Sequence, residues 1–536
     1  MRSVQFTHLH VASSFSLRYG TTPPKRLVER AHELGYERLA LTDRDGLYGV
    51  VKFVEACRDH DIEPVVGVDL ALEPPTPTIS SRPRRTPAKG GAAVDDRGPR
   101  VTVLARGAAS GLAKGVGWGQ LCRLVTDAHL VGERSAARTS RERIARFVTV
   151  EEVGRGNSAP ALTVLLGPAS DVGQALLAER PAAAEQLLKQ WRAALPHGAL
   201  AVEVACHDGA PGTPASRRHA LDLWALARAC GVPAVLTGWV RHADADEAVT
   251  ADLLDAARRM VALDLRHLDR TSTRGHLLPE SEMLEIAREL AQAAGDESAA
   301  LDLVGATSRL AELCVQHPFH DIGIGAVHLP EPEVLDLDGV DPQRALAERC
   351  RAALPARYGH LSATEYAAVE ERLDDELEVV RHLGYPTYFL TVAIVCDLIR
   401  DAGVRVAARG SGAGSLINYL LGISGVDPIR HRLLMERFCT PLRASLPDID
   451  IDVESARRTE MYERIMERFG GERVTCVSMA ETYRVRHAIR DAGAALGMPP
   501  ADVDVIAKAF PHIAARNARQ AIEELPELRA RGLASS

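Results

Sequence analysis

The 536-residue sequence lacks the features that mark secreted, disulfide-bonded and membrane-spanning proteins. Its nine cysteines are scattered, odd in number and never arranged as Cys-x-x-Cys, which argues against a disulfide framework and a cysteine-bound zinc. No apolar run is long enough to span a bilayer, and the N-terminus lacks the apolar stretch of a secretory signal. We therefore expect a cytoplasmic protein with reduced thiols and no membrane partner.

The chain also lacks an excess of positive charge. It carries 64 Lys and Arg against 72 Asp and Glu, a formal net charge of −8. No global positive field attracts nucleic acid, so any DNA contact must come from a local basic patch. With 46% apolar and 25% charged residues, the composition is that of an ordinary globular protein, and the length predicts two to four domains.

The N-terminal half alternates predicted strands with predicted helices. Strands are expected at 4–10, 38–42, 64–70, 101–104, 161–166, 200–205 and 232–236, with helices at 24–34 and 47–59 between the first three. This rhythm predicts βαβ units around a parallel sheet or barrel. Residues 73–100 are rich in Pro, Ser, Thr and Gly and interrupt it, which predicts a disordered surface insertion.

Longer helical patterns replace this rhythm after about residue 275. Helices are expected at 282–294, 345–354 and 365–383, and a further helical region begins near 480. We therefore expect three domains, at 1–275, 276–480 and 481–536.

Three carboxylates alternate with isoleucines in the segment Pro447–Asp452. Alternation is the period of a strand, so Asp448, Asp450 and Asp452 are expected on one face. Neighbouring acids on that face would repel by roughly 2–3 kcal/mol, and a hard divalent cation such as Mg²⁺ removes that penalty. A solvated acidic edge strand has the same pattern, so the strand alone leaves both interpretations open.

A glycine-rich turn precedes this strand. Residues 404–408 read as a strand, and Arg409-Gly410-Ser411-Gly412-Ala413-Gly414-Ser415 lead into a predicted helix at 416–421. Such a turn suits a phosphate, although a turn that only caps a helix has the same composition. It is not a P-loop, because no Lys-Ser or Lys-Thr follows at the required spacing. Metal-binding acids beside an anion cradle are what nucleotidyl transfer requires.

The segment from the glycine-rich turn to the acidic strand resembles the palm of C-family bacterial replicative DNA polymerases, the DnaE-type polymerase III alpha subunits. Its sequence is ARGSGAGSLINYLLGISGVDPIRHRLLMERF, followed by LPDIDID. The segment GYPTYFL at 384–390 and the basic helix TYRVRHAIRD at 482–491 fit the same family. The DVESARR and TYRVRHAIRD segments are most similar to its error-prone, actinobacterial branch. The expected fold is α/β: an N-terminal PHP (β/α)7-like barrel, a mixed α+β palm of the nucleotidyltransferase type, and a helical partial thumb.

The resemblance implies a template-directed DNA polymerase for error-prone replication and repair, which extends a primed DNA template with dNTPs. It implies Asp448 and Asp450 as catalytic ligands of two Mg²⁺ ions, and Asp452 as a supporting acid. The implied contacts to the dNTP triphosphate are Arg409, Gly410, Ser411, Gly414 and Ser415. The implied contacts to DNA or phosphate are Arg486 and Arg490, four apart on one helix face, and Arg484 on another face.

His8 and His10 resemble the opening of the PHP domain, whose active members hydrolyse phosphoesters with a cluster of metals. Asp43, Glu203 and His207 also match. The departures are Ala12, Tyr19, Arg44, Asp69, Trp239 and Arg241, which stand where the family has ligands or their neighbours. This pattern implies a PHP domain without bound metals, in which an arginine pairs with Asp43 or Asp69.

The family also has a third catalytic acid on a later strand, whereas this chain ends 84 residues after Asp452 (536 − 452). We therefore expect a fragment that lacks this acid and the clamp-binding region, and that is inactive alone. For the full-length protein, the resemblance implies a sliding clamp and repair-polymerase accessory factors as partners. Two alternatives stay open: a PHP-type metal-dependent phosphoesterase, and a non-catalytic fragment that binds DNA or a partner protein.

Overall fold

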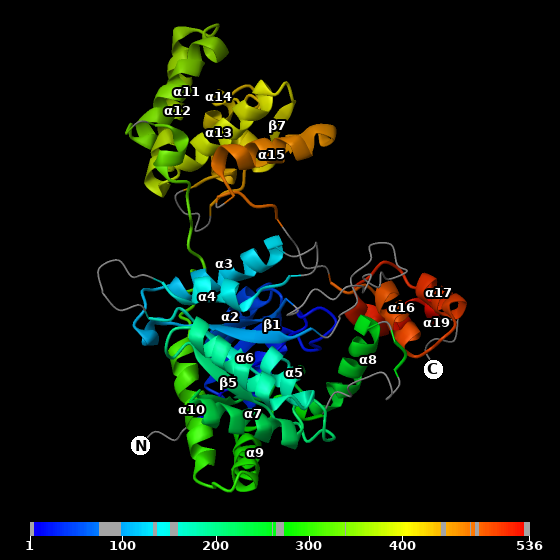
Figure 1. The fold of residues 1–536 in the computed structure, drawn as a ribbon. Helices are drawn as coiled ribbons and strands as arrows, with labels where there is room; N and C mark the ends of the chain where they lie inside the picture. Colours follow the sequence, from blue (N-terminus) through cyan, green and yellow to red (C-terminus); the bar gives the residue numbers. More distant parts are fainter. Residues whose placement is uncertain are drawn as a thin grey trace. The chain divides into compact units, whose positions relative to one another are not determined.

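The computed structural model describes residues 5–73, 98–131, 137–150, 159–259, 261–263, 273–337, 339–440, 446–471, 473–477 and 482–529. The chain forms two compact units, one of residues 1–324 together with 480–536 and the other of residues 325–479 (Figure 1). Most of the predicted insertion at 73–100 lies outside the described residues.

A six-stranded sheet forms the centre of the first unit. Its strands, in chain and spatial order, are β1 (Arg38–Arg44), β2 (Glu63–Ala71), β3 (Arg100–Ala105), β4 (Leu162–Leu166), β5 (Leu200–Val204) and β6 (Ala234–Leu236). Strands β4 and β5 are buried along their whole length, as expected for apolar strands covered on both faces. The predicted parallel order holds except at β3, which runs antiparallel to both neighbours. The direction reverses where the 73–100 segment interrupts the βα rhythm.

Residues 8–12 join the two edges of this sheet. The backbone bonds run from Ala40 N–H to His8 O (3.1 Å), from Thr42 N–H to Val11 O (2.7 Å), from Val240 N–H to His10 O (2.9 Å) and from Ala12 N–H to Val240 O (2.9 Å). Because β1 and β6 lie at opposite edges, these bonds curl the sheet on itself. The predicted α/β, barrel-like architecture is therefore confirmed, although residues 5–10 make too few ladder bonds to count as the regular strand predicted there.

Within the described residues, fourteen α-helices of the first unit surround the sheet or follow it. They are α1 (Pro24–Glu33), α2 (Val50–Asp59), α3 (Val116–Val131), α4 (Arg141–Val148), α5 (Asp171–Leu177), α6 (Pro181–Ala194), α7 (Arg217–Cys230), α8 (Ala248–Arg259), α9 (Glu280–Ala293), α10 (Ala299–Cys314), α16 (Val485–Ala495), α17 (Pro500–Ala509), α18 (Ala518–Glu524) and α19 (Pro526–Arg529). Figure 1 shows α5, α6 and α7 over one side of the sheet, and α5 contacts β4 while α7 contacts β5.

The first unit extends beyond the boundary expected at residue 275. Helix α10 packs on β2 and β6, and Thr307 accepts a hydrogen bond from Leu236 N–H (2.8 Å). Its buried face completes a cluster with the sheet, which is why α9 and α10 belong to this unit and not to the next. The region expected as a separate domain at 481–536 also belongs here, because α16 packs on α8 and Leu263 N–H donates to Ala495 O (2.7 Å).

The second unit is mainly helical, with a two-stranded antiparallel sheet. Its elements are α11 (Pro342–Tyr358), α12 (Ala363–Leu383), α13 (Pro386–Asp401), β7 (Val406–Arg409), α14 (Leu416–Leu420), β8 (Asp450–Val453) and α15 (Arg458–Phe469). Ser362 and Glu365 form a capping box that begins α12, and Gly384, with φ +73°, ends it. No single described helix is long and apolar enough to cross a membrane; only α12 and α13 together meet that test, and they bend by 112°.

Candidate functional site

The acidic strand presents its carboxylates to solvent. Strand β8 pairs antiparallel with β7, and Arg409 lies opposite Asp450. Asp448, Asp450 and Asp452 are exposed, while the two isoleucines between them are partly buried against the apolar cores of the unit. The side chains thus alternate as a strand pattern requires.

The three aspartates differ in their partners. Arg409 Nε lies 3.1 Å from Asp452 Oδ1, and both side chains are about two-thirds exposed. Asp448 and Asp450 make no hydrogen bond or ion pair within the described residues. Their four carboxylate oxygens are hard donors of the kind that Mg²⁺ takes, so these residues fit a divalent cation better than Asp452 does.

The glycine-rich turn begins beside Asp450. Gly410 has φ +75°, and a Cβ placed on it would lie 3.7 Å from Asp450 Oδ2. Arg409, Gly410 and Ser411 are all exposed at this end of the turn. A positive φ favours glycine at this position. Because Gly410 has no side chain, the backbone of the turn can lie close to the acidic strand.

The other end of the turn is interior. A Cβ on Gly414 would lie 2.6 Å from Leu434 O, so only glycine fits there without a shift. Ser415 is fully buried and begins α14 by accepting a hydrogen bond from Asn418 N–H (3.2 Å). Of the five residues expected at a triphosphate, the structure brings three to the surface beside Asp450 and uses Gly414 and Ser415 for packing and capping.

A buried carboxylate, which the sequence analysis missed, occupies the N-terminus of α14. Glu376 of α12 accepts hydrogen bonds from Ser415 Oγ (3.0 Å), Leu416 N–H (2.8 Å) and Ile417 N–H (3.2 Å), and pairs with Arg372 Nε (3.1 Å). Burial raises the pKa of Glu376, and the Leu416 and Ile417 amides and Arg372 oppose the shift. The start of α14, which was expected near a phosphate, thus already has an internal acceptor: the helix has five residues, and the Leu416 and Ile417 N–H groups face Glu376.

The basic helix α16 lies in the first unit and is partly engaged internally. Arg486 Nε donates to Phe510 O (3.0 Å), and Arg490 pairs with Asp504 (2.9 Å). The Arg484 side chain is exposed. The structure thus assigns these arginines and the acidic strand to different units.

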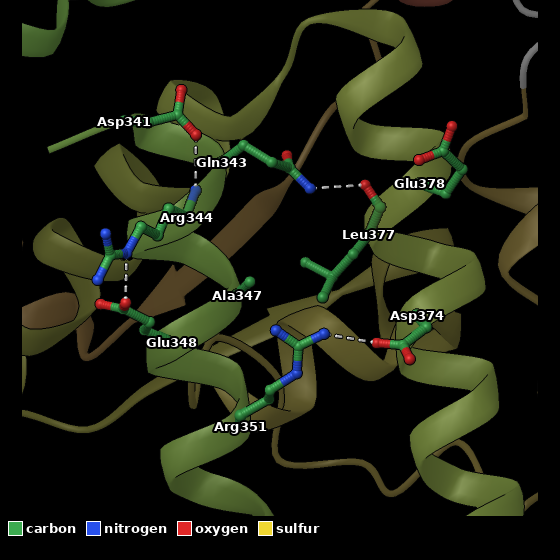
Figure 2. A pocket seen from close by; sticks show the side chains of 9 residues that line it. All are labelled: Asp341, Gln343, Arg344, Ala347, Glu348, Arg351, Asp374, Leu377 and Glu378. Carbon is green, nitrogen blue, oxygen red and sulfur yellow. Dashed lines mark hydrogen bonds and ion pairs between the residues drawn. The ribbon is translucent and has the colours of Figure 1, made fainter.

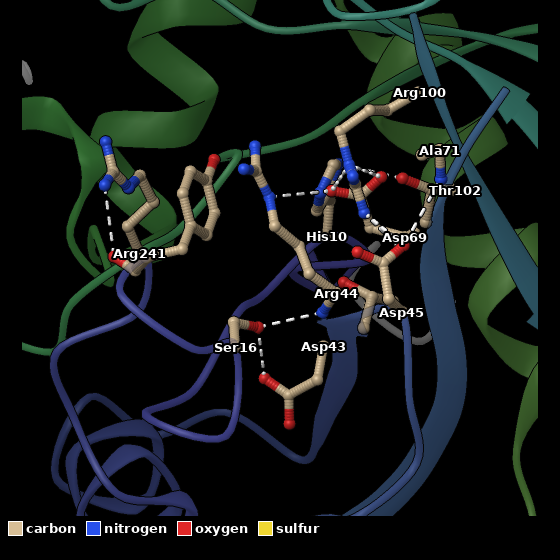
Figure 3. Close-up of polar contacts among 12 residues, drawn as sticks. His10, Ser16, Asp43, Arg44, Asp45, Asp69, Ala71, Arg100, Thr102 and Arg241 are labelled. Carbon is tan, nitrogen blue, oxygen red and sulfur yellow. Dashed lines mark hydrogen bonds and ion pairs between the residues drawn. The ribbon is translucent and has the colours of Figure 1, made fainter. Parts of the chain in front are cut away.

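At the PHP site, arginines hold the acid that a metal would need. Asp69 Oδ2 lies 3.2 Å from Arg44 Nε, and Asp69 Oδ1 lies 3.1 Å from Arg100 Nε (Figure 3). Burial would raise the pKa of Asp69, but Arg100 and Arg44 lower it below its usual value. Of the two acids expected to pair with an arginine, the structure selects Asp69.

An arginine–tyrosine stack lies beside this pair. The Tyr19 ring has the guanidinium of Arg44 at 3.3 Å from its centroid and that of Arg241 at 3.9 Å. Arg241 donates to both carboxylate oxygens of Asp255 (3.0 and 2.9 Å), and Arg258 donates to the same side chain (2.8 Å). Desolvation alone would raise the pKa of Asp255, yet Arg241 and Arg258 lower it to about 2.

The PHP histidines are mainly satisfied core groups. His8 Nε2 is hydrogen-bonded to Leu278 O (3.0 Å), and His207 Nε2 to Gly238 O (2.8 Å); burial lowers the pKa of each imidazole to about 4. His10 Nδ1 pairs with Glu203 Oε1 (2.8 Å). Nε2 of His10 has no hydrogen-bond partner within the described chain. It does not belong to any group of three His, Cys, Asp or Glu side chains among the described residues that could hold a metal ion.

Asp43, the remaining PHP match, is held by serines. It accepts hydrogen bonds from Ser13 N–H (2.6 Å), Ser13 Oγ (2.8 Å) and Ser16 Oγ (2.7 Å). Burial raises its pKa to about 6. Across the described residues no three His, Cys, Asp or Glu side chains are arranged to hold a metal, so the PHP residues present do not fit the family's metal cluster.

One cavity of the second unit, of about 540 Å³, lies between α11 and α12 (Figure 2). Its charges pair with one another, Arg344 with Glu348 (2.7 Å) and Arg351 with Asp374 (2.7 Å). The lining includes none of the acidic-strand or glycine-turn residues, so this cavity is separate from the candidate site.

Residues 344–534 match the family model "Bacterial DNA polymerase III alpha NTPase domain", and residues 8–207 match "PHP domain". The chain is 31% identical to an error-prone DNA polymerase of Symbiobacterium thermophilum, covering 99% of this chain and 44% of that protein. It is 32% identical to an error-prone DNA polymerase of Mycobacterium bovis (95% and 42%) and 29% identical to a DNA polymerase III subunit alpha of Escherichia coli (98% and 42%).

The chain thus spans less than half the length of these curated relatives. Among solved structures, it has a weak similarity to an amidohydrolase from Chromobacterium violaceum, with 18% identity and a TM-score of 0.24 over 44% of this chain and 87% of that one. That similarity is too low to bear on function.

Proposed function

Because the chain belongs to the family of bacterial DNA polymerase III alpha subunits and error-prone DNA polymerases, we propose that it supplies palm acids of a DNA-directed DNA polymerase. The observation that supports this most directly is a pair of exposed carboxylates beside the glycine-rich turn, Asp448 and Asp450, which have no partner among the described residues. A solvated acidic strand would not require a turn that approaches it so closely.

Asp448 and Asp450 would hold the divalent cations on which DNA polymerases depend, and we propose two Mg²⁺ ions. Metal ions held by these two residues would stabilise the ionised 3′-oxygen of a primer and the negative charge of a departing pyrophosphate. Arg409, Gly410 and Ser411 would orient the dNTP triphosphate through a guanidinium, a backbone N–H and a hydroxyl. The exposed Arg409–Asp452 pair contributes little to stability, so Arg409 is free to exchange its partner for a phosphate.

DNA is the proposed macromolecular partner. Arg484 and Arg490 are exposed and Arg486 is partly buried, and both Arg486 and Arg490 would first have to release internal acceptors. A sliding clamp and accessory factors would act with the whole polymerase, in the cytoplasm, during error-prone replication and repair. The names of the relatives support an error-prone DNA polymerase that acts in replication and repair, and the clamp and the accessory factors are part of the proposal alone.

The PHP domain is proposed to be structural and free of metal. Arg44 and Arg100 neutralise Asp69, the acid that a metal cluster would need. A PHP phosphoesterase is therefore the less favoured alternative, and a non-catalytic binding fragment explains neither the acidic strand nor its adjacent turn.

The test is primer extension by the protein. Asp450→Asn should lower the rate about a thousandfold, because a metal ligand contributes several kcal/mol to the transition state. Asp374→Asn, an exposed acid of the same unit paired with Arg351, should leave the rate unchanged. Unchanged extension by Asp450→Asn would remove the assignment, and hydrolysis of p-nitrophenyl phosphate that persists in that variant would favour the phosphoesterase.

A further inference from the structure

A tyrosine hydroxyl spans the backbone on both sides of Asp448. Tyr388 Oη donates to Pro447 O at 2.8 Å and accepts from Ile449 N–H at 3.1 Å. These two peptide groups are the ones that flank Asp448. A single side chain therefore fixes the backbone on either side of a proposed metal ligand.

The sheet does not provide this support. The β7–β8 ladder covers Asp450 to Val453 and pairs Asp450 with Arg409, so it ends before Asp448. Asp448 precedes β8, and its carboxylate is repelled by the like charge of Asp450. The ladder therefore does not fix the backbone of Asp448.

Helix α13 gives Tyr388 a fixed position. The helix begins with Pro386 at its first residue, which sets the backbone angle of the first turn. Phe389, the next residue, is fully buried and contacts the Tyr388 ring edge-on with centroids 5.9 Å apart. The phenol therefore projects from an anchored helix and not from a loop.

We propose that Tyr388 is a positioning residue, which holds the Asp448 backbone so that the carboxylates of Asp448 and Asp450 face the same metal-binding site. This inference rests on the proposed function, since it assumes that these two acids bind metal. Residues that orient metal ligands through hydrogen bonds commonly change metal affinity about tenfold when they are removed. Tyr388 differs from most of these because it acts on the backbone of its ligand.

The experiment measures Mn²⁺ binding to the chain by electron paramagnetic resonance. Tyr388→Phe keeps the ring and removes both hydrogen bonds, and it should weaken Mn²⁺ binding about tenfold. Asp448→Asn and Asp450→Asn should weaken it further. Tyr358→Phe is the matched control, because it removes a hydroxyl that donates to Asp427 (2.8 Å) elsewhere in the same unit, and it should leave the affinity unchanged.

A double-mutant cycle separates positioning from a general loss of structure. In the Asp448→Asn background, Tyr388→Phe should cause almost no further change, since the group it positions is already absent. An equal weakening in both backgrounds would show a merely structural role and overturn the inference, whether or not the variant is less stable. Unchanged binding in Tyr388→Phe, with weakened binding in both aspartate variants, would also overturn it while leaving the proposed function intact. Unchanged binding in the aspartate variants would instead overturn the proposed function.

Discussion

Asp255→Asn removes the anion that holds Arg241 beside the Tyr19 ring, and we expect a stability loss that depends on pH. The pKa of Asp255 falls from its ordinary 3.8 to about 2 in the folded chain. Each pH unit corresponds to about 1.4 kcal/mol, so this shift contributes about 2 kcal/mol to the free energy of unfolding. The residue is 2% exposed, so solvent screening reduces this value little.

The sign follows from the lowered pKa. A carboxyl whose pKa is lower in the folded state contributes its full stability above the unfolded pKa, here 3.8. That contribution disappears as the pH falls through the folded pKa of about 2, and about half of it remains at pH 3. The stability difference between the original chain and Asp255→Asn should therefore narrow by about 1 kcal/mol between pH 6 and pH 3. A pH-independent cost will remain, because the substitution also breaks a buried ion pair.

Urea unfolding followed by tryptophan fluorescence measures this difference. All four tryptophans, at positions 118, 191, 224 and 239, lie in the first unit, so their emission reports on the unit that contains Asp255. Asp222→Asn is the control: Asp222 pairs with Arg218 on the surface of α7 and should change stability by less than about 0.5 kcal/mol. A stability difference for Asp255→Asn that stays constant from pH 6 to pH 3 would refute the reasoning.

Two further predictions concern the buried acids. Glu376→Ala should leave the Leu416 and Ile417 amides without their acceptor at a cost of about 3–5 kcal/mol, and hydrogen exchange there should quicken at least a hundredfold. Glu378→Ala on the same helix should not alter that exchange, and equal exchange in the two variants would contradict the prediction. Because arginines already pair with Asp69, dialysis against EDTA should not shift the unfolding midpoint of the first unit. Stoichiometric Zn²⁺ or Mn²⁺ in the purified chain, measured by elemental analysis, would argue against this account.

The sequence predicted much of the fold because its local periodicities are clear. The expected helix at 24–34 and the strands at 38–42 and 64–70 agree with α1, β1 and β2 to within two residues. The direction of β3 was not predictable, because strand direction depends on where the intervening chain crosses the sheet. The boundary at 275 rested on the change from alternating strands and helices to long helical patterns. The sequence of an amphipathic helix such as α10 does not reveal which surface its apolar face covers.

In the candidate site, too, the sequence predicted the features that depend on local patterns and missed those that depend on contacts distant in the chain. The alternating pattern predicted that the aspartates lie on one face of the strand. Glu376 was missed because its hydrogen-bond partner lies forty positions later in the chain. A single acidic residue in a helical pattern indicates only a solvent-exposed charge. The loss of PHP ligands indicated an arginine at Asp69 or Asp43. The stack on Tyr19 was missed, although an aromatic ring introduced together with arginines is a signal for cation–π packing.

The first unit has a consequence for how this chain is made on the ribosome. Residues 8–12 need Val240 as a hydrogen-bonding partner, and α8 needs α16, which emerges only after the whole of 325–479 has been synthesised. Contacts so distant in sequence form slowly and leave apolar faces exposed in the nascent chain. Expression of residues 1–324 alone should therefore favour aggregation, and a chaperone that shields α8 during translation should raise the yield of folded protein.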